Sequence, residues 1–332
     1  MEDKQQGGFI LIDLQSNKSK THNTNIHIMK KTVVLSLICC LFWANQTTAQ
    51  QDPQYTQYMY NMNVVNPAYA GLKEGLAVNL LYRNQWTALD GAPETYTAAI
   101  HSPINEKVGL GGSIIRDQLG PITETNAYAD FSYKFQVSNN YQLSLGVKAG
   151  ATFHDIGLTP LALQTPGDPF FSQDVNATNP NIGTGAFLFS DKFYVGLSVP
   201  NLLNSTHLDE DNLRFGSETN HYFLTSGYVF EPTNKIKLKP SFLVKSSFNA
   251  PVSFDVNLNA LYLERFEVGV SYRLDDSFSG LVGFQATPDF RIGYAYDAVT
   301  SEINNVAPSS HEIILSYNLI FNKRVLRSPR YF

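Results

Sequence analysis

The sequence predicts an all-β fold: a transmembrane, outer-membrane antiparallel β-barrel of about 14 strands with a short N-terminal helical or plug segment. Three observations support this prediction. Side chains alternate between apolar and polar along many stretches, these stretches are as long as a tilted strand that crosses a bilayer, and the connections between them alternate in length. Charged residues are only 16% of the chain and aromatic residues are 13%, which favours a surface that is not entirely in water.

The clearest alternation runs over residues 252–262, which read VSFDVNLNALY. The even-numbered residues are all apolar, whereas Ser253, Asp255, Asn257 and Asn259 are polar. A strand has a side-chain period of two, so this stretch has one apolar face and one polar face, whereas a helix would place Asp255 among apolar residues. We expect the apolar face to meet lipid and the polar face to line the lumen of a barrel.

Fourteen stretches are interpreted as strands, and the even number suits a closed barrel. Alternation is weak in 182–190 and 220–230, where a shift of register by one residue is easy to make. The expected strands are 75–85, 94–102, 107–117, 124–136, 140–154, 182–190, 192–199, 220–230, 234–246, 251–262, 264–274, 277–287, 289–297 and 310–321.

The connections between the expected strands sort by parity. The even-numbered connections are short, and the odd-numbered ones include all of the long ones, although 275–276 is a short odd connection. Outer-membrane barrels have short periplasmic turns and longer outer loops, so the sorting predicts which end faces the periplasm. An even number of strands then places both termini on the periplasmic side. The long connections are 86–93, 155–181, 200–219 and 298–309.

The N-terminal region has the pattern of a secretory signal peptide. Residues 29–49 begin with the letters MKK, continue with an apolar run and end with small residues before Ala49, where we expect cleavage. Residues 1–28 are interpreted as an upstream extension from a start codon assigned too early, with Met29 as the true start. The mature protein would cover 50–332, divided into an N-terminal segment (50–74), the barrel (75–321) and a C-terminal tail (322–332).

Cysteine and charge content exclude several classes of site. Cys39 and Cys40 are the only cysteines. A lipoprotein anchored at Cys40 is an alternative, but Cys39 stands where such signals have Gly or Ala. If cleavage occurs at Ala49, the mature chain has no thiol for a disulfide, a metal or a nucleophile. Residues 1–49 carry five of the 24 basic residues and three of the 29 acidic residues, which leaves 19 against 26. This acidic balance predicts no nucleic-acid partner.

The segment before the first strand predicts a short helix. Tyr55, Met59 and Met62 recur at i, i+4 and i+7, which favours a helix over 54–63. The pair Asn66-Pro67 would end it. We expect this piece to lie at the periplasmic mouth or inside the lumen, where it would form a lid or plug.

Candidate catalytic and ligand-binding patterns are weak, so we expect no enzymatic activity, no cofactor and no metal site. The glycines of 109–112 fall in mid-strand, where they suit close packing better than a phosphate loop. Residues 209–211 are acidic and follow His207, but their spacing matches no calcium loop. His101 and Ser102 are sequence neighbours on a strand, so they face opposite sides and cannot act as base and nucleophile.

The inward face carries many charged residues, and two interpretations stay open. The charges could form ion pairs that hold the lumen rigid, or they could give a pore that prefers anions. The expected inward cations are Lys134, Lys148, Lys235, Lys237, Lys239, Lys245, Arg265, Arg273 and Arg291, and the expected inward acids are Asp130, Asp255, Glu267, Asp275 and Asp297.

Several stretches together resemble the PorP/SprF family, outer-membrane proteins of the Bacteroidetes type IX secretion system. The stretches are DPQYTQYM at 52–59, NPAYAG at 66–71, RNQW at 83–86, GLGGSIIRDQLGP at 109–121 and SPRYF at 328–332. The resemblance spans the expected mature chain and leaves residues 1–28 without a counterpart.

The resemblance implies a role in the export or surface attachment of secreted proteins, including gliding adhesins. The implied partners are type IX secretion components at the periplasmic face and cargo or adhesins with a C-terminal secretion signal, besides outer-membrane lipid. It implies no catalytic residues. The candidate plug or partner surface, drawn from the shared motifs, comprises Gln54, Tyr58, Asn66, Pro67, Arg83, Gln85 and Trp86.

Two other classes remain as alternatives. An outer-membrane porin for passive or specific diffusion would use the same barrel with an open lumen. A secreted soluble β-protein would cover its apolar faces with protein instead of lipid.

Overall fold

The computed structural model describes residues 54–158, 173–203, 206–210, 213–217, 220–247 and 250–320, and within 204–219 and 248–250 it describes no side chains. The expected upstream extension, the signal peptide with its two cysteines and the C-terminal tail 322–332 lie outside the described residues.

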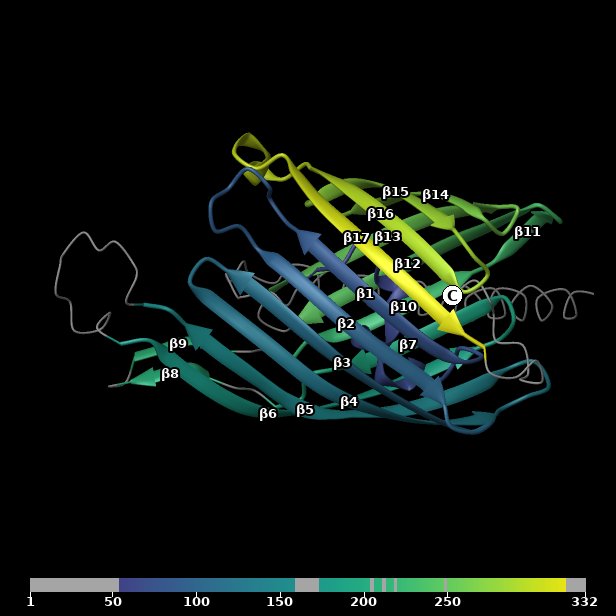
Figure 1. Ribbon diagram of the computed structural model, residues 1–332, viewed down its shortest axis with the longest axis horizontal. Helices are drawn as coiled ribbons and strands as arrows, with labels where there is room; N and C mark the ends of the chain where they lie inside the picture. The colour runs from purple at the N-terminus through teal and green to yellow at the C-terminus, as the bar shows by residue number, and fades with distance from the viewer. Residues whose placement is uncertain are drawn as a thin grey trace, which may run out of the picture. The chain divides into compact units, whose positions relative to one another are not determined.

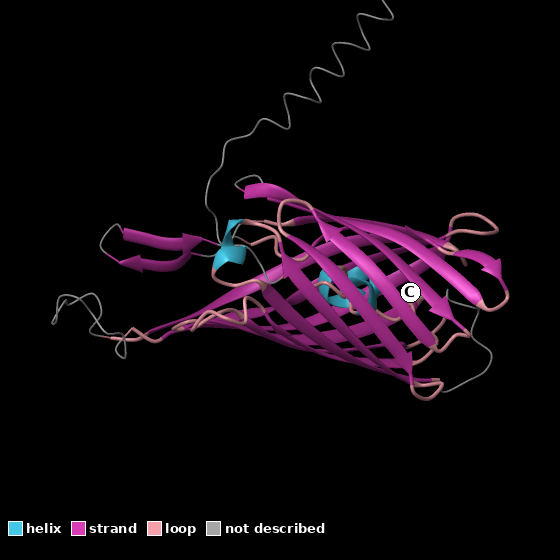
Figure 2. Ribbon diagram, turned by 90° about the horizontal axis from the view of Figure 1, so that it is seen from above, coloured by secondary structure: helices cyan, strands magenta, loops and turns pink. Residues whose placement is uncertain are grey.

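Within the described residues, fifteen strands form one sheet, in which β11 (Phe230–Thr233) pairs with β12 alone and the other fourteen close into a ring. Neighbouring strands of the ring are antiparallel, β17 returns to pair with β1, and β10 pairs with both β7 and β12. Figures 1 and 2 show this barrel from two sides. The prediction of a 14-stranded barrel is confirmed. Its strands are β1 (Leu76–Asn84), β2 (Glu94–Pro103), β3 (Val108–Leu119), β4 (Ile122–Gln136), β5 (Gln142–Ile156), β6 (Val175–Phe189), β7 (Phe193–Val199), β10 (Tyr222–Tyr228), β12 (Ile236–Ser247), β13 (Ala250–Tyr262), β14 (Phe266–Arg273), β15 (Ser277–Gln285), β16 (Phe290–Val299) and β17 (Ser309–Leu319).

Several expected elements differ from the structure. The sixth strand begins at Val175 instead of at 182, and its first residues pair with the end of β5. The stretch 175–181 reads VNATNPN and carries asparagines on both faces, so it lacks the regular apolar–polar alternation by which a strand could be recognised. β8 (Thr206–Glu210) and β9 (Leu213–Ser217) form a hairpin of their own within an expected loop.

The helix expected over 54–63 is replaced by three short turns: η1 (Tyr58–Tyr60), α2 (Met62–Val65) and η2 (Pro67–Tyr69). Asn61 separates η1 from α2 with a non-helical backbone (φ −125°, ψ 42°), and Asn66 ends α2 in an extended conformation with a φ of −138°. The side-chain oxygen of Asn66 accepts the N–H of Ala68, which caps η2. No helix among the described residues is long and apolar enough to cross a membrane.

The two faces of the wall follow the predicted alternation. Along β13, Asp255, Asn257 and Asn259 are at most 2% exposed, whereas Val256 and Leu258 are 45% and 48% exposed. An apolar face that points away from the protein on every side needs hydrocarbon around it, and the closed ring leaves no unpaired edge in that hydrocarbon.

The barrel has two mouths, which we name by the connections they carry. The even-link mouth carries only short connections, at 104–107, 137–141, 190–192, 263–265 and 286–289, besides the β11 extension. The odd-link mouth carries 85–93, 120–121, 157–174, 200–221, 248–249, 274–276 and 300–308, the last of which contains η4 (Glu302–Asn305). β1 begins and β17 ends at the even-link mouth, because the number of strands is even.

Exposed aromatic side chains gather towards both mouths on the outer face. Two such girdles are typical of transmembrane barrels, whose aromatic rings lie at the membrane–water interfaces. Aliphatic residues such as Val268 and Val270 lie between them. Neighbours across the strands include Tyr82–Tyr96 and Tyr272–Phe278 near the odd-link mouth, and Tyr262–Phe266 and Phe266–Phe284 near the even-link mouth.

A charge between the two girdles should destabilise the barrel. Val268→Arg would place a guanidinium in hydrocarbon, and we expect the free energy of unfolding to fall by about 2–4 kcal/mol. Denaturant unfolding in lipid vesicles measures this loss. Leu274→Arg, in the turn after β14, is the control, with an expected loss of at most about 1 kcal/mol. Equal losses in the two variants would contradict a lipid-facing wall.

Candidate functional site inside the barrel

Residues 54–72, which we call the luminal segment, lie inside the barrel. Figure 2 shows the helical turns η1, α2 and η2 within the ring of strands. Tyr58, Met59 and Met62 are at most 2% exposed and Ala68 is fully buried. A location inside the lumen was one of the two positions expected for this piece. The strands carry inward polar groups, so the segment must supply hydrogen-bonding partners for them as well as fill the volume of the lumen.

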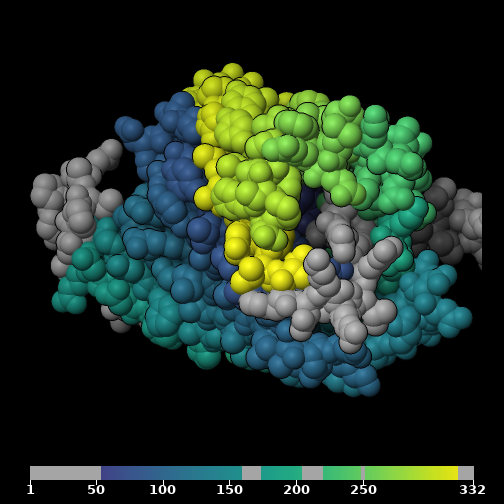
Figure 3. Space-filling model, turned by 45° about the vertical axis from the view of Figure 1, so that its right-hand side comes forward, coloured from purple at the N-terminus to yellow at the C-terminus, as the bar shows by residue number. Residues whose placement is uncertain are grey.

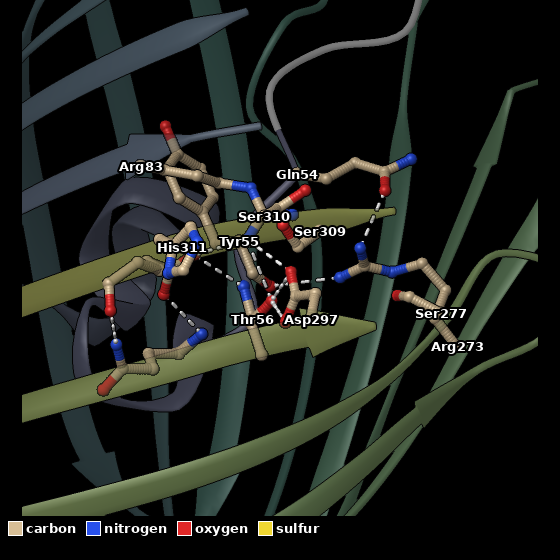
Figure 4. Close-up of polar contacts among 12 residues, drawn as sticks. Gln54, Tyr55, Thr56, Arg83, Arg273, Ser277, Asp297, Ser309, Ser310 and His311 are labelled. Carbon is tan, nitrogen blue, oxygen red and sulfur yellow. Dashed lines mark hydrogen bonds and ion pairs between the residues drawn. The ribbon is translucent and has the colours of Figure 1, made fainter. Parts of the chain in front are cut away.

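A buried ionic cluster holds the beginning of the segment (Figure 4). Nη1 of Arg83 on β1 lies 2.7 Å from Oδ2 of Asp297 on β16 and 3.2 Å from Oε2 of Glu312 on β17. The same nitrogen donates to the Thr56 hydroxyl over 3.0 Å, and that hydroxyl donates to Asp297 over 2.9 Å. All four side chains are at most 2% exposed. Three strands and the luminal segment therefore meet at one buried cation.

Glu312 also binds the backbone of the luminal segment. One of its oxygens accepts the N–H of Thr56 over 2.9 Å, and the other accepts the N–H of Gln57 over 2.7 Å. Hydrogen bonds from backbone N–H groups to an ionised carboxylate are among the stronger hydrogen bonds in proteins. They fix the path of the main chain at this point, independently of which side chains follow.

Gln54 extends the contact to the odd-link mouth. Its side-chain oxygen accepts a hydrogen bond of 2.9 Å from Arg273, the last residue of β14, which also binds Asp276 in the turn at that mouth. Arg273 in turn pairs with Asp255 on β13 over 2.8 Å. The even strand count predicts termini on the side of the even-link mouth. The luminal segment instead leads back from the start of β1, through the lumen, to the opposite mouth.

The middle of the segment contacts β13, β14 and β16. The hydroxyl of Tyr58 accepts a 3.0 Å hydrogen bond from Asn257, and the hydroxyl of Tyr60 donates to Glu267. Arg291 pairs with Glu267 over 2.9 Å, and its guanidinium lies 3.6 Å from the centre of the Tyr60 ring. The Tyr60 ring and the Glu267 carboxylate together offset the cost of removing the Arg291 guanidinium from water.

The end of the segment packs against glycines of the opposite wall. A Cβ atom on Gly146 of β5 would overlap the backbone of Ala68, and one on Gly185 of β6 would overlap the side chain of Asn66. Gly109 of β3 leaves room in the same way for the Ala70 carbonyl. This agrees with the expectation that the glycines of 109–112 serve close packing, because they lie within β3 and Gly109 lies directly against a neighbouring backbone.

Polar groups on β2 and β4 complete this end. The Ser132 hydroxyl donates to the Ala70 carbonyl over 2.6 Å, and Nδ1 of His101 accepts the N–H of Gly71 over 3.1 Å. His101 is buried in the lumen, while Ser102 lies on the other face and donates to its neighbouring carbonyl. The two residues therefore face apart, as expected, and form no catalytic pair.

Several of the buried lumen charges form ion pairs. Besides the pairs of Arg273 and Arg291, Lys148 lies 2.8 Å from Asp130. Lys239 and Lys245 lie over the rings of Tyr60 and Phe223. Three residues expected in the lumen, Lys235, Arg265 and Asp275, are instead exposed in turns at the mouths. β12 and β14 begin two residues later than expected, after Lys235 and Arg265, and Asp275 lies in the turn between β14 and β15. This arrangement favours the rigid, ion-paired lumen over an anion-selective pore.

The candidate residues fall into two groups. Gln54, Tyr58, Asn66 and Pro67 belong to the luminal segment, and Arg83 contacts it from the wall.

Gln85 and Trp86 lie apart, in the turn after β1 at the odd-link mouth. The Gln85 N–H donates to the Pro93 carbonyl, and the Trp86 N–H donates to the Ser310 hydroxyl over 3.1 Å. Trp86 has a positive φ of 55°, a strained conformation for a non-glycine residue.

Sequence reasoning missed Thr56 and Glu312. An isolated acidic residue on the polar face of an expected strand was the available signal for Glu312.

Other candidate chemistry gains no support. Among the described residues no group of His, Cys, Asp and Glu is arranged to hold a metal ion. The acidic stretch 209–211 and His207 lie where side chains are not described.

A pocket of about 660 Å³ opens at the even-link mouth. Figure 3 looks towards this mouth, which is hollowed beside the end of β17. Tyr60 and Lys73 line the pocket from the side of the N-terminal segment, and Arg265, Glu267 and Arg291 line it from the wall. Burial and the nearby Arg291 lower the pKa of Lys73 to about 8. The pocket is therefore a mixed-charge vestibule that ends at the luminal segment.

Comparison with protein families decides the classification. The family model described as "Type IX secretion system membrane protein PorP/SprF" matches residues 47–317. The chain belongs to this family. Membership, together with the barrel, places this PorP/SprF protein in the outer membrane and associates it with type IX secretion. The family contains membrane components of a secretion system, which agrees with a non-enzymatic barrel. No curated protein matches the chain.

Solved structures resemble this PorP/SprF protein in fold alone. The outer membrane protein Omp33 of Acinetobacter baumannii is 9% identical with a TM-score of 0.46, over 75% of this chain and 100% of that one. The CymD monoaromatic hydrocarbon channel is 14% identical with a TM-score of 0.47, over 78% and 92%. The toluene transporter TodX of Pseudomonas putida is 10% identical with a TM-score of 0.43, over 84% and 100%.

Removing the Glu312 charge should loosen the start of the luminal segment. Glu312→Gln removes the ion pair with Arg83. It also replaces one of the two side-chain oxygens that accept backbone N–H groups by an amide nitrogen, which can only donate. We therefore expect the free energy of locally opening the start of the luminal segment to fall by about 3 kcal/mol. Hydrogen exchange at Thr56 and Gln57 should become about 100-fold faster. Glu302→Gln, in the exposed η4, is the control without effect. Unchanged exchange in Glu312→Gln would contradict the anchoring role.

Proposed function

We propose that this PorP/SprF protein supports the export or surface attachment of secreted proteins, such as gliding adhesins, by binding proteins and not by passing solutes. The observation that carries the proposal is the luminal segment, which runs between the two mouths and is held by the Arg83 cluster, by Tyr60 and by the glycine wall. A lumen filled in this way leaves the two mouths as the surfaces on which partners can act.

The mouths have different proposed partners. Short connections favour a periplasmic even-link mouth, where the vestibule offers a concave, mixed-charge surface to other type IX components. Long connections favour an external odd-link mouth, where cargo or an adhesin with a C-terminal secretion signal would attach. Gln85 and Trp86 then belong to the external surface, whereas Gln54, Tyr58 and Arg83 brace the luminal segment beneath it.

An outer-membrane porin is the second candidate. The vestibule and the many polar side chains of the wall favour it. In a porin, however, the luminal segment would have to leave the lumen or leave a path beside it, and the buried contacts of Arg83 and Glu312 oppose such a movement.

Conductance in planar bilayers separates the two candidates. We expect the mature protein to show no large, steady conductance, because the luminal segment blocks the barrel. Glu312→Gln, which keeps the barrel wall intact, should add brief conductance openings, because the start of the luminal segment is held less firmly. Deletion of residues 54–72, if the variant inserts, should open a steady pore. A large steady conductance of the unaltered protein would favour the porin and contradict the plugged lumen.

Secretion in cells tests the role of the Arg83 cluster. Arg83→Met should impair secretion while the barrel still inserts, as shown by a gel mobility that shifts on heating. Arg83→Lys keeps the charge and should retain part of the activity, although Lys is less suited than Arg to a cluster with two carboxylates.

Trp86→Ala tests the odd-link mouth separately. We expect it to reduce the amount of secreted protein that stays attached to the cell surface. Normal secretion in Arg83→Met and normal attachment in Trp86→Ala would together contradict the proposal.

A further inference from the structure

One cation interrupts the apolar outer wall of the barrel. Among the Lys and Arg residues that lie in described strands of the ring, Arg116 on β3 is alone in facing outward. Ile114, on the same face, is 57% exposed, whereas Ser113 and Ile115, on the opposite face, are buried. A charge on the lipid face costs free energy at the centre of the bilayer and little at its interfaces. The depth of Arg116 in the membrane therefore decides whether its charge is costly there.

Arg116 lies at the level of the aromatic girdle near the odd-link mouth. Tyr82 on β1, Tyr96 on β2 and Arg116 on β3 are direct neighbours across the strands, and the two tyrosine rings have centroids 4.9 Å apart. Aromatic rings in such a girdle lie among lipid head groups. The guanidinium of Arg116 is thus at the depth at which a head-group phosphate is found.

A groove adjoins the guanidinium on the side of the bilayer centre. It holds about 340 Å³ and lies over β17, β1, β2 and β3, the part of the wall that faces the viewer in Figure 1. Leu80, Ala98 and Ile114 are neighbours in the next row of outward side chains, and all three line the groove, as Arg116 does. The methyl group of Ala98 is smaller than the side chains on either side of it, so it forms the floor of the depression.

The donors of Arg116 are not engaged by the protein. Within the described residues, Arg116 makes no hydrogen bond or ion pair. Glu94, an acid of the same outer face, accepts a 2.9 Å hydrogen bond from the hydroxyl of Tyr96. A guanidinium presents a planar set of N–H donors that matches the oxygens of a phosphate, and such pairs are often bidentate.

We propose that Arg116 and the Ala98 groove form a binding site for one phosphorylated glycolipid of the outer leaflet. The phosphate binds the guanidinium, and one acyl chain lies in the groove over Ala98. The occupant is a lipid because a single molecule then satisfies both an apolar groove and a cation at interfacial depth. The outer leaflet follows from the long connections at the odd-link mouth. The site is on the outside of the wall and does not depend on the luminal segment.

Native mass spectrometry of the mature protein in detergent tests the site. The probes are bisphosphorylated lipid A, its dephosphorylated counterpart and phosphatidylglycerol. We expect one lipid A molecule to bind each chain in preference to the other two probes. Arg116→Gln, which removes the charge, and Ala98→Leu, which fills the groove, should each weaken the binding of lipid A about tenfold.

Two control variants match these changes. Arg265→Gln removes a cation at the even-link mouth, and Ala129→Leu enlarges an exposed outward alanine on β4. Both should bind lipid A as the unaltered protein does, and heat-shifted gel mobility confirms that every variant is folded.

Three results would overturn the proposal. Binding that is unaffected by Arg116→Gln would show that the lipid is a non-specific annulus. A preference for phosphatidylglycerol would place the site in the inner leaflet. A dimer that excludes lipid A and is lost in Ala98→Leu would assign the groove to a second copy of the chain.

Discussion

The hydrogen bonds of the backbone are the constraint on which this structure depends. In hydrocarbon an unpaired N–H or C=O group has no water to bind, so a sheet can cross the membrane only if its edges meet. β17 meets β1, and β10 meets β12 although the short strand β11 lies between them in the sequence. Closure turns one face of every strand towards lipid and the other towards an enclosed space. The composition of each face follows from that division.

The enclosed space sets the second requirement, because buried charges need partners. The barrel meets it with pairs between neighbouring strands, such as Lys148 with Asp130 and Arg273 with Asp255, and with the luminal segment. Glu312 and Asp297 are two carboxylates beside one arginine, and the Thr56 hydroxyl and two backbone N–H groups of the luminal segment supply further donors. The segment is thus part of the electrostatic balance of the lumen and not only a filler of volume.

The strands and their faces could be predicted from the sequence, because a period of two is a local property: Asp255 and Val256 show their opposite orientations within a few residues. The path of residues 54–72 could not. Thr56 and Glu312 are 256 positions apart, and no local pattern brings them together. The first residues of strands were also hard to predict, which is why Lys235 and Arg265 were expected in the lumen. The orientation of Arg116 was within reach, since it shares its parity with Ile114, but only the register reveals its tyrosine neighbours.

The route of the luminal segment has a consequence for how the molecule is assembled. The segment lies within a ring whose last seam joins the first strand to the final one, and its strongest anchors come from that final strand and its neighbour. A polypeptide that formed the cylinder first would then have to pass buried tyrosines and a charged cluster through a narrow opening. If the wall folds around the segment, this passage is avoided. Pairing of β1 with β17 then occurs together with the hydrogen bonds from the Thr56 and Gln57 N–H groups to Glu312. Contacts so distant in the chain form late and slowly, so insertion and sealing would be completed in one closing step.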